Sequence, residues 1–177
     1  PEAPLKLLVV KERGTTGMYG SWFGQQDSKL YSAMLSMGFN DKSASQGQWS
    51  PGGSYGKGKA ALVRASGTRT VIAYTCYEDE GDEGITRRLL GVNYWPPHVT
   101  KDGKRFTGFA RFGDIKEDQV IPYANDDADH IAQSLGLDTR DPSNPDEWGT
   151  TFVMLQPTVQ PRDLNKAFER NWLPAIV

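Results

Sequence analysis

The sequence has few of the residues that build metal sites, disulfides and common catalytic centres. Its 177 residues include one cysteine, Cys76, and two histidines, His98 and His130. A single cysteine excludes an internal disulfide and a zinc site built on cysteine ligands, and it favours a reducing, cytoplasmic compartment. Cys76 stands among β-branched and aromatic residues, which indicates a core thiol rather than a nucleophile. The two histidines are far apart in sequence and predict neither a metal site nor a catalytic pair.

Long apolar runs and an excess of one charge are also lacking. No stretch approaches the roughly 18 apolar residues of a membrane span, so we expect no membrane partner. Lys and Arg number 20 against 22 Asp and Glu, which gives a net charge of −2. Proteins that bind nucleic acid usually carry a basic excess, so the overall composition does not indicate nucleic acid as a partner.

What the sequence does contain is typical of a folded domain. Hydrophobic residues make up 37% and charged residues 24% of the chain, and 177 residues can bury a core without metal or disulfide bonds. We therefore expect residues 1–177 to form a single domain. Because the chain starts with Pro1 rather than Met, we also expect it to be a piece of a longer protein.

The order of predicted elements indicates an α+β fold. The expected strands are Leu5–Val10, Arg69–Tyr77, Thr86–Tyr94, Arg105–Phe112 and Thr150–Leu155. The expected helices are Gln25–Phe39, one that starts inside the glycine cluster Gly52–Lys59 and continues up to Gly67, Asp126–Leu135 and Asp163–Trp172. The two strands on either side of the acidic segment Glu78–Gly84 predict an antiparallel hairpin. The fold class that follows is a two-layer α/β sandwich, with a mixed, mostly antiparallel sheet and helices on one face.

A cluster of glycines is the strongest local signal. Gly52–Lys59 contains four glycines and two lysines at the start of a predicted helix. Closely spaced glycines expose consecutive backbone N–H groups, and a helix N-terminus attracts anions, so a polyphosphate could bind here. The alternative is a loop whose glycines only permit a tight turn. The polar segment Asp41–Ser54, which overlaps the start of this cluster, has the length and composition of a lid or binding loop.

A P-loop is one specific interpretation of this cluster. Gly53–Lys59 fits the pattern G-x-x-x-x-G-K, but Ala60 stands where a magnesium-binding hydroxyl belongs. A P-loop also follows directly on a buried strand, and Gln46–Pro51 is not one. These departures disfavour a P-loop.

Three segments in order resemble the GHKL ATPase family, which includes the ATPase component of DNA gyrase, heat-shock chaperone ATPases, histidine kinases and MutL. Glu12–Gly17 follows a predicted strand, Gly53–Lys59 opens a helix, and Gly149–Thr151 opens a late strand. In that family, a D-x-G-x-G turn, a G-x-x-G-x-G lid segment and a later Gly-Thr assemble the nucleotide pocket. The resemblance implies a Bergerat-like fold and ATP as the ligand.

The resemblance also implies roles for individual residues. The lid glycines Gly53, Gly56 and Gly58 would surround the phosphates with backbone amides, and Lys59 would add a positive charge. Glu12 would accept a hydrogen bond from the exocyclic amine of adenine, in a turn that Gly14 and Gly17 bring close to the base. Thr150 or Thr151 would contribute a hydroxyl, or its bound water, at the same edge of the base.

Two departures from the family bear on activity. Glu12 is one methylene longer than the family's aspartate. The family's first motif lies on a helix before the first strand and supplies a magnesium-binding asparagine and, in hydrolysing members, a general-base glutamate. Only Pro1–Pro4 precede the strand here, so Mg²⁺ would lack its usual ligand and we expect no hydrolysis by this chain alone.

Two functions from different classes follow. One is an ATP-binding, nucleotide-sensing domain of a larger bacterial ATPase, whose partners are the nucleotide and the remaining domains of the parent protein. The alternative is a non-catalytic interaction or scaffold domain with a degenerate nucleotide pocket.

Overall fold

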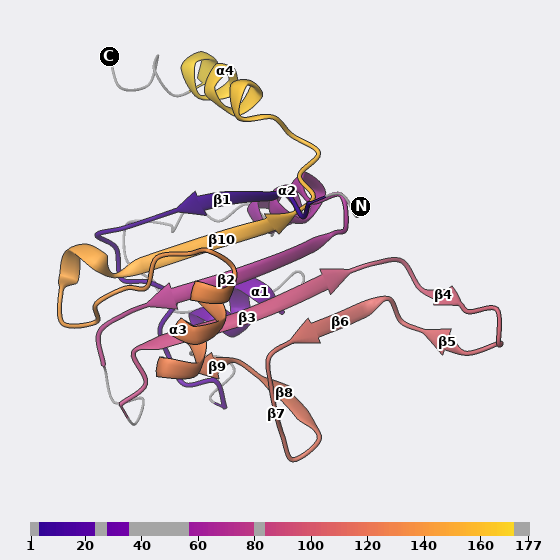
Figure 1. Cartoon of the computed structure of the whole chain (residues 1–177), viewed down its shortest axis with the longest axis horizontal. Helices are drawn as coiled ribbons and strands as arrows, with labels where there is room; N and C mark the ends of the chain where they lie inside the picture. The colour runs from indigo at the N-terminus through magenta and orange to yellow at the C-terminus, as the bar shows by residue number, and fades with distance from the viewer. Residues whose placement is uncertain (1–3, 24–27, 36–56, 80–83, 172–177) are drawn as a thin grey trace, which may run out of the picture.

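A six-stranded antiparallel sheet forms the centre of the fold (Figure 1). The structure, a computed structural model, describes residues 4–23, 28–35, 57–79 and 84–171. The strand order is β1-β10-β2-β3-β6, and β9 also pairs with β3. The strands of this sheet are β1 (Leu7–Lys11), β2 (Thr70–Cys76), β3 (Arg87–Tyr94), β6 (Phe109–Phe112), β9 (Tyr123–Ala124) and β10 (Gly149–Leu155).

The hairpin of β2 and β3 was expected from the sequence and is confirmed. Its register runs from Thr70 opposite Asn93 to Cys76 opposite Arg87. All residues of β2 after Thr70 are buried, because this strand lies between β10 and β3. Every strand pair recorded in the described part of the chain is antiparallel, so the α+β class holds.

Helices cover both faces of the sheet, which corrects the expectation of helices on one face. Val71 and Ala73 of β2 pack with α1 (Lys29–Met34) and α2 (Lys57–Ala65). Ile72 and Tyr74 point to the other face and pack with α3 (Asn125–Ser134). Figure 1 shows α3 and α1 on opposite sides of β2 and β3. The physical reason is that consecutive residues of β2 are apolar, so both faces of the central strands need cover.

Most of the remaining differences between the expected and the observed strands lie in short strands between β3 and β9. The expected strand Arg105–Phe112 is interrupted at Gly108, which has φ +79 and lies so close to Trp95 that an added Cβ would be 2.0 Å from its carbonyl oxygen. The result is β5 (Arg105–Phe106), which pairs with β4 (His98–Val99), followed by β6. A second small hairpin joins β7 (Asp114–Lys116) to β8 (Gln119–Ile121).

Asn125 is the first residue of α3, and its side chain binds to the chain outside the helix. The N-cap of α3 is Ala124, without a side-chain hydrogen bond. The Asn125 amide instead accepts from the backbone N of Thr86 at 3.0 Å and donates to the carbonyl of Gly84 at 2.9 Å. The side chain of Asn125 therefore joins the start of α3 to the segment 84–86, which leads into β3.

The remaining elements lie at the C-terminal side of the fold. A 3-10 turn, η1 (Pro145–Glu147), precedes β10, and α4 (Pro161–Asn171) follows it. Figure 1 shows α4 beyond the β1 edge of the sheet. Within the described ranges, no helix has the length and apolar character needed to cross a membrane. The segment Asp41–Ser54, expected to be a lid, lies outside the described residues.

Candidate functional site

Two of the three sequence segments that suggested a nucleotide site lie together at one end of the sheet. Lys11, the last residue of β1, pairs with Thr151 of β10. The backbone N of Glu12 donates to the carbonyl of Thr150 at 2.8 Å, and the N of Thr15 donates to the carbonyl of Trp148 at 3.3 Å. The turn after β1 and the start of β10 therefore form one junction, which we call the Glu12–Thr150 junction.

The glycines at this junction are required for different reasons. Gly17 has φ +64, and a Cβ there would lie 2.3 Å from the carbonyl oxygen of Cys76. A Cβ on Gly149 would lie 2.5 Å from the carbonyl oxygen of Glu12. Gly14 has φ +67, but an added Cβ would meet nothing within 4 Å. Gly17 and Gly149 thus serve close packing of the chain on itself, whereas Gly14 borders open space.

The segment after Gly17 crosses the ends of the central strands. The backbone N of Met18 donates to the hydroxyl of Thr75 at 2.8 Å. Further along, the guanidinium of Arg88 on β3 donates to the carbonyl of Gly20 at 2.9 Å. These bonds hold the segment against the same sheet face that α1 and α2 cover, since Met18 belongs to that core.

The two threonines of the Gly-Thr-Thr segment point to opposite faces of the sheet. Thr150 is 1% exposed, and its hydroxyl lies 3.2 Å from the hydroxyl of Thr75. Thr151 is 2% exposed and accepts a hydrogen bond from Arg140 at 2.9 Å. Successive residues of a strand alternate between faces, so Thr150, and not Thr151, shares a face with the crossing segment at Met18.

Arg140 is the main residue of this junction that the sequence did not indicate. Its side chain is buried, with the residue 4% exposed. The guanidinium donates to the carbonyl of Glu147 at 2.7 Å, to the carbonyl of Glu12 at 2.8 Å and to Thr151. Burial and the nearby Arg13 lower the pKa of Arg140 from its usual value. A lone arginine in a polar loop carries no recognisable motif, which explains why sequence reasoning missed it.

A second group of polar side chains joins α3 to strands β2 and β3. The Tyr74 hydroxyl donates to Asp129 at 2.6 Å and accepts from the backbone N of Arg140 at 3.2 Å. Asp129 also forms an ion pair with Arg87 at 2.9 Å. Burial, followed by the Asp129 carboxylate, raises the pKa of Tyr74. Asp129 is therefore a structural partner of β2 and β3.

The expected phosphate side of the site is only partly described. Gly58 and Lys59 belong to the first turn of α2, and Gly53 and Gly56 lie outside the described residues. The C-terminal end of α2 adjoins the far end of β10, where the carbonyl of Ala65 accepts from Thr158 N at 2.8 Å. The described residues thus bring together Glu12, Gly14, Gly17, Thr150 and Thr151, but they do not place the lid glycines beside them.

Three cavities lined by described residues lie away from this junction. An apolar cavity of about 320 Å³ lies between α1, α2 and the sheet, lined mainly by Met34, Leu62, Val92 and Phe152. Its apolar lining does not suit a polyphosphate. In the described part of the chain, no three His, Cys, Asp or Glu residues are grouped to hold a metal ion. Cys76 is fully buried, and burial raises its pKa to about 11, which fits an unreactive thiol.

Comparison with known proteins gives no relative from which a function could be taken. No family model matches the chain, no curated protein matches it, and no solved structure matches it.

Proposed function

We propose that this chain is an ATP-binding domain of a larger bacterial ATPase of the GHKL type, with the adenine at the Glu12–Thr150 junction. The observation that carries the proposal is that Glu12 and Thr150, which are distant in sequence, are joined by a backbone hydrogen bond of 2.8 Å. The family resemblance requires these two segments to meet at one edge of the base. The same proposal includes a Bergerat-like sandwich as the fold and a glycine-rich lid over the phosphates.

The chemistry of the junction suits the base side of a nucleotide. The Glu12 residue is exposed, and its carboxylate is a natural acceptor for the exocyclic amine of adenine. Gly14, beside it, leaves open space where another residue would place a side chain. Gly58 and Lys59 at the start of α2 would supply backbone amides and a positive charge toward the phosphates. ATP would bring Mg²⁺ with it through its own phosphate oxygens.

One observation favours the alternative, an interaction or scaffold domain with a degenerate pocket. The hydroxyls of Thr150 and Thr151 are buried and already engaged with Thr75 and Arg140. Both threonines can therefore be explained by the stability of the sheet end alone.

Calorimetric titration with ATP and GTP separates the two functions. For an ATP-binding domain we expect a dissociation constant between ~10 µM and ~1 mM for ATP. The variant Glu12→Gln should weaken ATP binding by roughly tenfold, because it removes a charged hydrogen-bond acceptor. It should also bring the ATP and GTP affinities closer together, since the glutamine amide can donate to the guanine carbonyl.

The control for this titration is Glu169→Gln, which makes the same change of charge at an exposed position of α4. It should bind ATP like the unmodified chain. The absence of any heat at millimolar ATP would favour the scaffold domain. An unchanged ATP-to-GTP ratio in Glu12→Gln would place the base elsewhere.

A further inference from the structure

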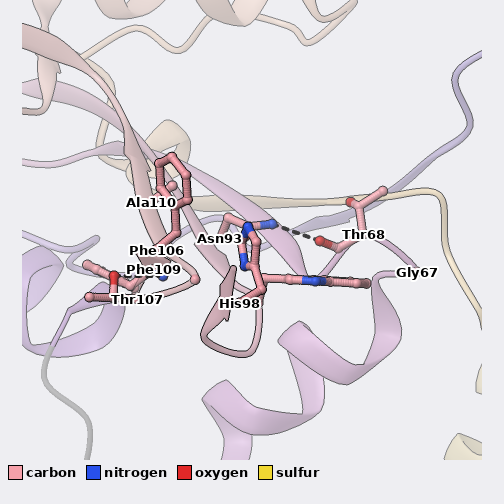
Figure 2. A pocket seen from close by; sticks show the side chains of 10 residues that line it. Gly67, Thr68, Asn93, His98, Phe106, Thr107, Phe109 and Ala110 are labelled. Carbon is pink, nitrogen blue, oxygen red and sulfur yellow. Dashed lines mark hydrogen bonds between the residues drawn. The ribbon is translucent and has the colours of Figure 1, made fainter. Parts of the chain in front are cut away.

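A second cavity lies at the opposite end of the central strands from the Glu12–Thr150 junction. Its volume is about 440 Å³, and it is bounded by the turn before β2, the end of β3, the β4–β5 hairpin and the start of β6. The residues that define its chemistry are Thr68, Asn93, Trp95, His98, Phe106 and Phe109. Figure 2 shows Thr68 and Asn93 beside His98, with Phe106 and Phe109 across from them.

Flat aromatic surfaces are exposed at this cavity. Trp95 is 48% exposed and Phe106 is 50% exposed. The rings of His98 and Phe106 are nearly parallel, with an interplanar angle of 17° and centroids 5.5 Å apart. The carbonyl of Pro96, 3.1 Å from the Nδ1 of His98, orients the imidazole. Aromatic side chains gathered in the open at a concave site are typical of a binding surface.

A fixed amide lies inside the same cavity. The Asn93 side chain donates from Nδ2 to the carbonyl of Thr68 at 2.8 Å and to the hydroxyl of Thr70 at 2.9 Å. These bonds fix the orientation of the amide and do not use its Oδ1 atom. An amide oxygen accepts hydrogen bonds from N–H groups, and every nucleobase offers one: an exocyclic amine on adenine, guanine and cytosine, and the ring N3–H on thymine.

Positive charge is concentrated in the segment that carries these aromatic residues. The segment 95–111 contains Lys101, Lys104, Arg105 and Arg111 but only one acidic residue, Asp102, so its net charge is +3 in a chain of net charge −2. Arg69 lies 5.8 Å from the centre of the Trp95 ring and has an unusual φ of +54°. Arg111 lies 5.5 Å from the centre of the Phe109 ring. This charge would repel a second copy of the same surface and attract a polyanion.

We propose that this cavity and the β4–β5 hairpin bind single-stranded nucleic acid. Bases would stack on Trp95 and Phe106, and the phosphates would pass over the edge of the β4–β5 hairpin to Arg105, which alternates with Phe106 and therefore faces the other side of the hairpin. Stacking on exposed aromatics within a basic surface is the usual way in which proteins bind unpaired strands. A duplex fits less well because its bases already stack on one another and do not offer their faces.

The two proposed sites are independent of each other. The cavity lies at the Thr70 end of β2, and the Glu12–Thr150 junction lies at the Cys76 end, where Thr150 pairs with Thr75. A strand of seven residues separates its ends by roughly 20 Å. The nucleic-acid proposal therefore does not rest on the proposed function, and the two can fail separately.

Fluorescence anisotropy with a labelled oligothymidylate of about 12 nucleotides tests the stacking surface. The unmodified chain should bind at low salt, and Phe106→Ala should weaken binding about tenfold or more. Phe106 is half exposed on a peripheral hairpin, so the substitution should leave the core intact. The matched control is Phe23→Ala, at a phenylalanine that is 76% exposed and remote in sequence; it should bind normally.

Salt dependence tests the contribution of the cations. The logarithm of the binding constant should fall linearly with the logarithm of the salt concentration, by about 0.7 for each neutralised phosphate. Arg105→Gln should make this slope shallower by about that amount, whereas Arg162→Gln on α4 should not. Glu12→Gln should leave oligothymidylate binding unchanged, which separates this site from the proposed ATP site.

Several results would overturn the proposal. One is no anisotropy change at about 100 µM protein in low salt, where even weak non-specific complexes form. Another is equal binding by Phe106→Ala. If thymidine monophosphate competes as well as the oligonucleotide at equal nucleotide concentration, the site takes free nucleotides and not a strand. If poly-glutamate competes equally well, the surface recognises an acidic polypeptide.

Discussion

Replacement of Arg140 should destabilise the whole fold, because this one guanidinium joins three parts of the chain. It donates hydrogen bonds to Glu12 after β1, to Glu147 before β10 and to Thr151 within β10, over distances of 2.7 to 2.9 Å. All three acceptors are fixed by backbone geometry or burial. Arg140→Ala removes the guanidinium, so these three acceptors lose their donor, and it opens a space that water can enter only in part.

The magnitude follows from the number and kind of bonds. Hydrogen bonds from a charged donor contribute about 1.5–3 kcal/mol each, but they are not additive. We therefore expect Arg140→Ala to lower the free energy of unfolding by about 3–5 kcal/mol. For a domain of this size, each kcal/mol shifts the melting temperature by about 2–4 °C, so the expected shift is roughly 6–20 °C. Arg140→Lys should recover only part of the loss, since an ammonium lacks the planar fork of donors.

Urea unfolding followed by circular dichroism measures this loss of stability. The control is Arg162→Ala, because Arg162 has an 80% exposed side chain and, among the described residues, forms an ion pair only with its neighbour Asp163, at 3.8 Å. Its effect should stay within about 0.5 kcal/mol. The reasoning would be refuted if Arg140→Ala unfolded at the same urea concentration as this control.

Three further predictions concern stability and reactivity. Gly17→Ala should lower the free energy of unfolding by well over 2 kcal/mol, because its Cβ would lie 2.3 Å from a backbone oxygen. Gly14→Ala should lower it by only about 1 kcal/mol, because of the positive φ alone. Equal losses of stability in urea unfolding would contradict this prediction. Tyr74→Phe should cost about 1–2 kcal/mol, because it removes the hydroxyl that bridges Asp129 and the Arg140 backbone, and an unchanged unfolding midpoint would refute the bridge. Burial raises the pKa of Cys76 from 9.0 to about 11, so the stabilising effect of the neutral thiol is complete below pH 9 and is lost as the pH rises toward 11. Between these pH values the free energy of unfolding should fall by up to about 1.4 kcal/mol per pH unit. The fall should be less steep in Cys76→Ala.

The central sheet could be predicted because its signals are local. β2 and β10 are rich in β-branched and aromatic residues, β3 carries the apolar stretch Leu89–Val92, and a short acidic connection predicts the hairpin. The helix cover was mispredicted for a related reason. A strand with apolar residues at nearly every position needs cover on both faces, and the segment Val71–Cys76, in which Thr75 is the one residue outside the hydrophobic set, already contained that information.

The candidate sites were predictable only where a motif exists. Glu12, Gly14 and Thr150 fall in segments with a family-like pattern, so the sequence could suggest that they meet. Arg140 depends on two backbone carbonyls and a hydroxyl from distant segments, and no spacing in the sequence encodes such a contact. The aromatic cavity was missed because the charge of the whole chain hides the local excess near Arg105, and because β4 and β5 have only two residues each.

The internal hydrogen bonds at the Glu12–Thr150 junction bear directly on which function is correct. To meet a nucleotide, Thr150 would have to exchange its bond with Thr75, a neutral pair 3.2 Å apart. Such an exchange costs about 1 kcal/mol, whereas a dissociation constant between ~10 µM and ~1 mM corresponds to about 4–7 kcal/mol of binding energy. The exchange therefore lowers affinity without preventing binding. Thr151 differs, because its partner Arg140 is charged, buried and bonded to two other segments. If Thr151 gave up its hydrogen bond to Arg140, the buried guanidinium would lose one of its acceptors. If adenine binds at this junction, its hydroxyl contact comes from Thr150, and Thr150→Val should weaken ATP binding while Arg140 keeps Thr151 in place.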